Sequence, residues 1–344
     1  MRIGVLTGGG DAPGLNAAIR AVARSALAAG DSVVGVRNGW AGLTGDGDFV
    51  EMGRPDVSGI LQLGGTILGS SRVNPMKREG GTAECMGNLR SANLEALVAI
   101  GGDDTLSVAA WLAEQGAPVV GVPKTMDNDL SVTEYCIGFD SAVHIVTEAL
   151  DRLHTTAASH HRVMVVEVMG RDTGWVAVLG GLAGGADMII IPEFPTSLDE
   201  VVEHLDRRRQ QGSDFSIIVI AEGVEMEGMS GAGERSSATD AFGHSQLSKR
   251  GVGERLATML EDRTGHETRT TVLGYTQRGG SPTAYDRIWA TRVGAAAHQL
   301  ASGARWGMMP VVRCGSVDTA AIRDVVAEQR RVPADLYQLA QVFF

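Results

Sequence analysis

Residues 101–105 (GGDDT) carry two adjacent carboxylates directly after a glycine pair. Asp103 and Asp104 suit a hydrated Mg²⁺ that bridges to phosphate oxygens, because this hard cation keeps several waters and takes one or two carboxylates from the protein. Either carboxylate alone could instead cap a following helix, since Asp is a favoured N-cap residue. The pair therefore predicts a metal-phosphate site, with helix capping as the alternative.

Residues 123–129 (PKTMDND) combine an amine with two acids. A carboxylate here could accept the proton of an attacking sugar hydroxyl, which is the work of a general base. Lys124 could offset the charge that builds on a transferring phosphoryl group. Asn and Asp also commonly form turns through hydrogen bonds to their own backbone, so each polar residue alone has a structural explanation.

Residues 7–16 (TGGGDAPGLN) contain a triple glycine between an apolar run and an alanine-rich segment. Glycines let the backbone approach a phosphate closely, and N–H groups at the start of a helix favour an anion. The segment lacks the Gly-Lys-Ser/Thr of a P-loop, and Pro13 occupies the third glycine position of a dinucleotide fingerprint. It predicts an anion-binding loop, with a plain tight turn as the alternative.

Further charged residues lie at or near the ends of later apolar runs: Arg162, Arg171, Glu222, Arg269 and Arg278. Arginine is preferred for phosphate because its planar guanidinium group binds two oxygens at once. A single arginine is more often a solvated surface charge. Residues 169–171 (MGR) and 274–280 (GYTQRGG) place an arginine beside a glycine turn, which favours a phosphate site.

The elements that must position these loops alternate between apolar runs and helical patterns, which is typical of βαβ units and a parallel sheet. We predict strands at residues 2–6, 32–36, 95–100, 118–122, 162–168, 188–191, 216–221 and 270–273. We predict helices at residues 16–29, 106–115, 141–155, 198–209, 252–264, 284–300, 319–329 and 335–339. Residues 223–253 break the pattern and predict a mobile surface loop. The polar motifs follow strands, at the edge where open α/β sheets bind ligands.

The composition indicates a two-domain α/β protein and limits its partners. A chain of 344 residues exceeds the usual size of one domain, and 46 glycines indicate many turns. The net charge of −11 argues against a nucleic-acid-binding face. No apolar run is long enough to span a membrane, so no membrane partner is expected. Three scattered cysteines, Cys85, Cys136 and Cys314, favour buried thiols in a reducing compartment, and we predict a cytoplasmic protein.

With these motifs in this order, the chain resembles the 6-phosphofructokinases from about residue 4 to residue 327. The specific motifs are residues 123–129, 169–171 and 277–282 (QRGGSP), whereas Gly-Gly-Asp also occurs in related lipid and NAD kinases. The resemblance implies two Rossmann-like three-layer α/β domains, with mostly parallel sheets, facing across a cleft. The phosphoryl donor and Mg²⁺ are expected on residues 1–139 with about 282–327, and fructose 6-phosphate on residues 140–281 with about 328–344.

The resemblance also implies a role for each matching residue. Gly10 and Arg72 of residues 69–72 (GSSR) are expected to face the donor, Asp103 to hold Mg²⁺, and Asp127 to accept the proton of the sugar 1-hydroxyl. Catalytic roles are expected for Asp127, Lys124, Asp104 and Arg171. The sugar phosphate is expected to contact Thr125, Met126, Asp127, Met169, Gly170, Arg171, Glu222, Tyr275, Thr276, Gln277 and Arg278. Arg162 and Arg269 are expected to reach it from a neighbouring subunit, which implies a homodimer or homotetramer.

Asp104 and Lys124 are expected to make pyrophosphate rather than ATP the donor. ATP-using members have glycine at both positions, and the Asp–Lys pair resembles the pyrophosphate-using branch, as does Tyr275, where ATP-using members often have His. The Asp104 carboxylate would project into the place of an ATP α-phosphate, and like charges about 4 Å apart repel by roughly 4 kcal/mol near a protein surface. Pyrophosphate has no third phosphate and escapes this repulsion.

The predicted reaction is phosphoryl transfer from Mg-pyrophosphate to fructose 6-phosphate. Within the family, the alternative is an ATP-dependent or mixed-donor enzyme. Two alternatives come from other classes. A non-catalytic sugar-phosphate sensor is disfavoured because both Asp103 and Asp127 are present. A dehydrogenase is disfavoured because the dinucleotide glycine fingerprint is missing.

Overall fold

The computed structural model describes residues 1–227 and 251–344. Residues 228–250, the centre of the predicted 223–253 loop, lie outside the described residues. The described chain forms two compact units, residues 1–141 with 278–330, and residues 142–227 with 251–277 and 331–344. The assignment of the donor to the first unit and of the sugar to the second stays a prediction. In these two described stretches, no helix combines the length and the apolar character that a membrane span needs.

The first unit is built on a five-stranded sheet with the strand order β3-β2-β1-β4-β5. Its strands are β1 (Arg2–Thr7), β2 (Ser32–Val36), β3 (Phe49–Met52), β4 (Ala96–Gly101) and β5 (Val119–Pro123). The pairs β1–β2, β1–β4 and β4–β5 are parallel, and β3 is antiparallel to β2. All residues of β4 are buried, as expected of a central strand that is covered on both faces. An antiparallel hairpin, β10 (Met308–Arg313) with β11 (Ser316–Ala321), completes the strands of this unit.

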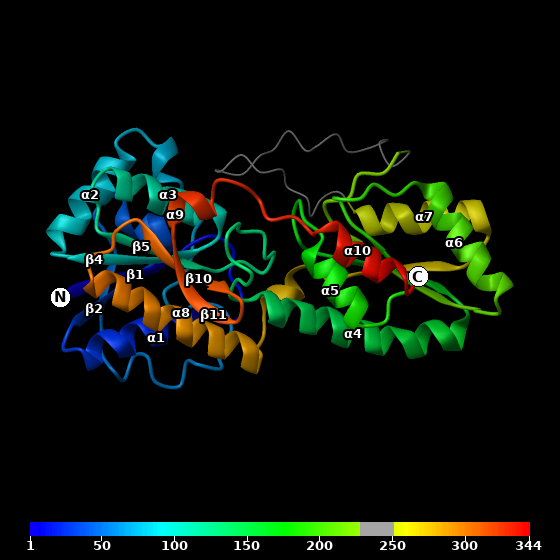
Figure 1. Cartoon of the computed structure of the whole chain (residues 1–344), viewed down its shortest axis with the longest axis horizontal. Coiled ribbons are helices and arrows are strands. Elements are labelled where there is room, and N and C mark those ends of the chain that lie inside the picture. The colour runs from blue at the N-terminus through cyan, green and yellow to red at the C-terminus, as the bar shows by residue number, and fades with distance from the viewer. Residues whose placement is uncertain (228–250) are drawn as a thin grey trace. The chain divides into compact units, whose positions relative to one another are not determined.

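Helices cover both faces of this sheet (Figure 1). On one face α1 (Leu15–Ala28) packs along α8 (Ala284–Ser302), and on the other lie α2 (Gly81–Ser91), α3 (Asp103–Glu114) and the short α9 (Ile322–Val325). Small side chains allow α1 and α8 to approach closely, because a Cβ at Gly294 would lie 2.8 Å from the Cβ of Ala21. Two 3-10 helices, η1 (Gly39–Leu43) and η2 (Pro75–Lys77), lie in the connections. The unit therefore has the three layers that the resemblance implies.

The second unit is a parallel four-stranded sheet with the strand order β7-β8-β6-β9. Its strands are β6 (Val163–Val168), β7 (Met188–Ile190), β8 (Ser216–Ala221) and β9 (Thr268–Val272). Its helices are α4 (Phe139–His160), α5 (Trp175–Ala183), α6 (Leu198–Gln210), α7 (Val252–Thr264) and α10 (Ala334–Gln341). α7 packs against β6 and β9, and α5 packs against β7 and β8, so helices cover this sheet as well (Figure 1).

The predicted elements are largely confirmed, with β2, β8 and α7 matching to the residue. The helix predicted at residues 106–115 instead begins at Asp103, which places Asp103 and Asp104 in its first turn. The helix predicted at residues 319–329 is confirmed only over the short α9 (Ile322–Val325). Its first residues belong to β11, where Ala320 pairs with Met309, because pairing with β10 outweighs the helical preference of alanine. Cys85 and Cys136 are buried, but Cys314 is exposed, contrary to the expectation of buried thiols.

Asp286 in α8 anchors the segment that leads from β5 to α4. Its fully buried carboxylate accepts hydrogen bonds from the Tyr135 hydroxyl (2.5 Å), the Gly138 N–H (2.6 Å), and the N–H (2.8 Å) and hydroxyl (2.6 Å) of Ser141. Burial raises the pKa of the Asp286 carboxyl, although four groups donate to it. The carboxylate thereby fixes the end of the loop that carries Lys124 and Asp127.

We expect Asp286→Ala to lower the free energy of unfolding by about 2–4 kcal/mol, because several buried donors lose their acceptor at once. Urea denaturation of the purified variant measures this loss. Asp286→Asn keeps the size of the side chain and one acceptor oxygen, so its loss should be smaller than that of Asp286→Ala. An Asp286→Ala variant within about 0.5 kcal/mol of the wild type, the usual range of a neutral surface change, would contradict this anchoring role.

Candidate active site

The strand order of the first unit brings three of the predicted loops to one edge of its sheet. β1 lies between β2 and β4, so the chain runs outward through β2 and β3 and returns to the other side of β1. Such a reversal opens a crevice beyond the carboxyl ends of the two central strands, where open α/β sheets bind ligands. The Gly8 N–H donates to the Ile100 carbonyl (3.0 Å), and the Lys124 N–H donates to the Gly101 carbonyl (3.0 Å). The loops after β1, β4 and β5 are therefore neighbours.

Lys124 connects the third of these loops to the first. Its side chain is 3% exposed, and its Nζ donates to the carbonyls of Gly8 (3.0 Å) and Gly10 (2.5 Å). Burial, and next the positive charge of Arg278, lowers the pKa of Lys124 to about 8. Lys124 thus holds the backbone of the glycine loop and brings a positive charge to it. The sequence predicted the charge but not this structural contact.

Arg278 also lies against the glycine loop. Its Nη1 donates to the Asp11 carbonyl (3.1 Å), and a Cβ at Gly10 would lie 2.7 Å from the same nitrogen. Gly10 therefore leaves room for a guanidinium group. Arg278 was predicted to contact the sugar phosphate, and the structure places it in the first unit, beside the residues predicted to bind the donor.

The segment with Arg72 follows the glycine loop closely. The Gly9 N–H donates to the Ser71 carbonyl (3.3 Å), and the Ser70 hydroxyl donates to the Gly9 carbonyl (2.5 Å). Gly9 has a φ of +76°, a left-handed conformation that favours glycine. The exposed side chain of Arg72 comes directly after these contacts. Gly10 and Arg72 were both predicted to face the donor, and the structure places them on two loops that are hydrogen-bonded to each other.

Asp103 and Asp104 begin α3 at the carboxyl end of β4. The N-cap is Gly102, without a side-chain cap, so the alternative that one of the two carboxylates is the N-cap is wrong. Acids in a first helical turn interact favourably with the helix dipole. Within residues 1–227 and 251–344, no three His, Cys, Asp or Glu side chains are grouped so that they could hold a metal ion. The pair fits Mg²⁺ nevertheless, because this ion usually takes one or two carboxylates and completes its shell with water and phosphate oxygens.

Asp127 is held in the loop after β5 by its neighbour Thr125. The Thr125 hydroxyl lies 3.3 Å from Asp127 Oδ2 and accepts the Asp127 N–H at 3.1 Å. Asn128 accepts the Cys136 N–H (3.0 Å), and Asp129 accepts from Gln329 Nε2 (3.1 Å). Asn128 and Asp129 therefore anchor the turn, while Thr125 orients Asp127.

Met126 was predicted to contact the sugar phosphate together with its neighbours. Its side chain is fully buried, so it packs in the core of the first unit. The residue can present only its backbone to a ligand, and its predicted contact with the sugar phosphate stays a prediction.

In the second unit, Glu222 at the end of β8 organises the Met-Gly-Arg turn at the end of β6. Its carboxylate is 5% exposed, and its Oε1 accepts the N–H groups of Gly170 (3.3 Å) and Arg171 (3.1 Å). Arg171 has a φ of +52° and Gly170 a φ of +155°, so a carboxylate supports an unusual backbone here. The structure brings together Met169, Gly170, Arg171 and Glu222, four of the residues expected to contact the sugar phosphate.

The residues after β9 form the 3-10 helix η4 (Gly274–Arg278). Tyr275 is 66% exposed. The Thr276 hydroxyl donates to the Leu273 carbonyl (2.6 Å), and the buried Gln277 donates through Nε2 to the Gly274 carbonyl (3.1 Å). Among these three predicted sugar contacts, Tyr275 presents its side chain to solvent, while Thr276 and Gln277 stabilise the turn.

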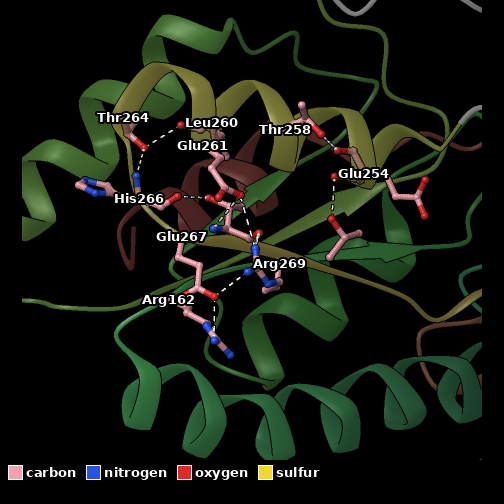
Figure 2. Close-up of polar contacts among 12 residues, drawn as sticks. Arg162, Glu254, Thr258, Leu260, Glu261, Thr264, His266, Glu267 and Arg269 are labelled. Atoms are coloured by element: carbon pink, nitrogen blue, oxygen red, sulfur yellow. Dashed lines mark hydrogen bonds and ion pairs between the residues drawn. The ribbon is translucent and has the colours of Figure 1, made fainter.

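Arg162 and Arg269 meet at one carboxylate, as Figure 2 shows. Nη2 of Arg162 lies 2.7 Å from Glu267 Oε1, and Nη2 of Arg269 lies 2.6 Å from the same oxygen. Sequence reasoning missed Glu267. The signal that could have found it is closeness in sequence, because Glu267 precedes Arg269 by two residues and lies directly before β9 (Thr268–Val272).

Residues 2–301 match the family model described as Phosphofructokinase. The chain is 53% identical to a pyrophosphate–fructose 6-phosphate 1-phosphotransferase of Amycolatopsis methanolica, over the full length of both chains. It is 44% identical to an ATP-dependent 6-phosphofructokinase of Corynebacterium efficiens, over 100% of this chain and 99% of the relative. The crystal structure of a pyrophosphate-dependent phosphofructokinase from Marinobacter aquaeolei has the same fold, with a TM-score of 0.83 and 24% identity over 97% of this chain and 86% of that one.

Proposed function

The chain belongs to the phosphofructokinase family, and on that premise we propose that it transfers a phosphoryl group from Mg-pyrophosphate to the 1-hydroxyl of fructose 6-phosphate. The products are fructose 1,6-bisphosphate and phosphate. The observation that supports pyrophosphate most directly is the buried Lys124 ammonium group at the glycine loop, in a chain that also carries Asp104. Both positions are expected to be glycine in ATP-using members.

The proposed chemistry divides its work among residues of the first unit. Asp127 accepts the proton of the 1-hydroxyl while the sugar oxygen forms a bond to phosphorus and the bond between the two phosphates breaks. Thr125 orients the Asp127 carboxylate. Lys124 and the N–H groups of the glycine loop offset charge on the transferred group and on the departing phosphate. Asp103, beside Asp104 in the first turn of α3, would hold Mg²⁺, which when bound neutralises charge on the phosphate oxygens.

The proposed sugar-phosphate site lies on the second unit. Arg171, on the turn that Glu222 supports, is placed to bind and orient the substrate. Tyr275 has an exposed side chain and follows β9, the strand that pairs in parallel with β6. Arg162 and Arg269 are proposed to reach the phosphate of a neighbouring chain's substrate, so the enzyme is a homodimer or homotetramer. Fructose 6-phosphate and pyrophosphate are its partners, and the proposed setting is the cytoplasm.

A coupled assay with each donor tests this function. With fructose 6-phosphate saturating, we expect kcat/KM for pyrophosphate to exceed that for ATP by at least about 30-fold. This ratio corresponds to half of the roughly 4 kcal/mol repulsion between Asp104 and an ATP phosphate. Equal or better use of ATP would instead identify an ATP-dependent or mixed-donor enzyme. Binding of fructose 6-phosphate without turnover by either donor would identify a sensor.

The pKa of Lys124, about 8, predicts an alkaline limit to turnover. Above that pH the amine becomes neutral and no longer offsets phosphate charge, so kcat/KM for pyrophosphate should fall about tenfold per pH unit. A pH profile from 6.5 to 9.5 measures this limb. Lys124→Met, which is already neutral and similar in length, should be slow throughout and should lack the limb. The same limb in Lys124→Met would assign it to another group.

A further inference from the structure

Glu267 gathers two guanidinium groups of the second unit (Figure 2). Its Oε1 accepts from Nη2 of Arg162 at 2.7 Å and from Nη2 of Arg269 at 2.6 Å. Arg269 also approaches Glu261 Oε2 through Nη1 at 3.5 Å. Paired β6 and β9 fix this arrangement, because the Val163 N–H donates to the Glu267 carbonyl (3.1 Å) and Met164 pairs with Arg269. The pairing of β6 with β9 therefore holds the two arginines close together.

Two guanidinium groups share one oxygen of Glu267, and Nη1 of Arg269 also donates to the Thr268 carbonyl (2.9 Å). Arginine carries five N–H donors in a planar fork, and its strongest contacts are bidentate. Glu267 receives one nitrogen from each arginine on a single oxygen, and the buried Nε of Arg162 has no hydrogen-bond partner in the described part of the chain. A phosphate monoester offers three terminal oxygens and two negative charges. It satisfies both guanidinium groups better than one carboxylate oxygen does.

The Glu267 side chain is also exposed enough to move when a phosphate binds to the two arginines. The side chains of Arg162, Glu267 and Arg269 are 27%, 41% and 50% exposed. The hydrogen bond from Arg162, followed by the charges of both arginines, lowers the pKa of Glu267, so it is ionised at neutral pH. An incoming phosphate thus meets a negative charge on the groups that are to bind it.

We propose that Glu267 is an internal counter-ion, which holds Arg162 and Arg269 together and competes with the phosphate of fructose 6-phosphate for them. This inference rests on the proposed function and adds a residue to it. Glu267 acts through the two arginines and is a positioning residue. It preserves the paired guanidinium groups when no substrate is bound, and its negative charge weakens substrate binding.

The amide variant Glu267→Gln separates these two effects. Its carbonyl oxygen still accepts from both arginines, whereas the negative charge is gone. Removal of one charge about 6 Å from a phosphate dianion should tighten binding about three- to tenfold in dilute salt, with a smaller effect as salt screens the charges. Glu267→Ala loses the shared acceptor as well, so it should bind the sugar phosphate more weakly than Glu267→Gln.

Titration calorimetry of fructose 6-phosphate with the full chain tests the proposal, together with steady-state kinetics in pyrophosphate. We expect Glu267→Gln to lower Kd and KM for the sugar phosphate about three- to tenfold, to change kcat less than twofold, and to lose this advantage as ionic strength rises. Asp199→Asn is the matched control, because Asp199 is an exposed acid of the same unit that pairs with Arg263 (2.6 Å). It should change neither constant.

An unchanged or higher Kd in Glu267→Gln would overturn the proposal, and so would an equal gain in Asp199→Asn. If Glu267→Ala binds as tightly as Glu267→Gln, Glu267 does not hold the arginines together. Arg162→Gln should weaken sugar binding in the same assay. These outcomes are distinct from failure of the proposed function, in which the wild-type enzyme itself would not turn over fructose 6-phosphate with pyrophosphate.

Discussion

Asp127→Asn should lower kcat by about 10²–10⁴-fold while Kd for fructose 6-phosphate changes less than threefold. The amide has the shape of the carboxylate and keeps the contact with Thr125, which lies 3.3 Å from Asp127 Oδ2. It cannot accept the proton of the 1-hydroxyl, so the loss falls on the chemical step. Steady-state kinetics with pyrophosphate, and calorimetry of sugar binding, measure the two effects separately.

Asp129→Asn is the matched control for this substitution. Asp129 lies two residues further along the same loop, is as buried as Asp127, and accepts a hydrogen bond from Gln329 (3.1 Å). Because its role is to anchor the turn, we expect a loss in kcat of less than tenfold and a measurable loss of thermal stability. Near-native turnover in Asp127→Asn, or equal losses in kcat in the two variants, would remove the general-base assignment from Asp127.

The double variant Asp104→Gly with Lys124→Gly should lower the ratio of kcat/KM for pyrophosphate over ATP by about 100-fold or more. Removal of the Asp104 charge relieves a repulsion of up to roughly 4 kcal/mol on an ATP phosphate. Removal of Lys124 costs the glycine loop both a positive charge and the donor to the Gly8 and Gly10 carbonyls, so pyrophosphate use should suffer most. Initial rates with each donor, over a range of Mg²⁺ concentrations, give the ratio.

The two single variants separate the effects of Asp104 and Lys124 on donor preference. Asp104→Gly should mainly raise ATP use, since it removes only the repulsion. Lys124→Met should mainly lower pyrophosphate use, because it keeps the length of the side chain without its charge. A double variant with the donor preference of the wild type would show that charge at these two positions does not select the donor.

The α/β architecture could be predicted from the sequence because most strands and helices have their own local pattern of apolar and polar residues. β8 (Ser216–Ala221) is a run of Ile and Val bounded by polar residues, and the structure has it at the predicted residues. Where the local sequence pattern and strand pairing favour different secondary structures, the pairing determines the structure. Residues 319–321 have the composition of a helix, yet they complete β11 because β10 offers backbone partners. The strand β10 itself and helices α2 and α5 were not predicted.

The sequence by itself determined which residue types follow each strand: the paired acids after β4, the Lys–Asp loop after β5 and the glycine loop after β1. Only the tertiary structure decided which of these groups touch. Lys124 reaches carbonyls 116 and 114 residues away, and Arg278 reaches one 267 residues away. Such contacts depend on the order in which strands pair, and local periodicity carries no information about that order. Glu267 shows the intermediate case, since its spacing to Arg269 was visible but its contact with Arg162 required β6 and β9 to lie side by side.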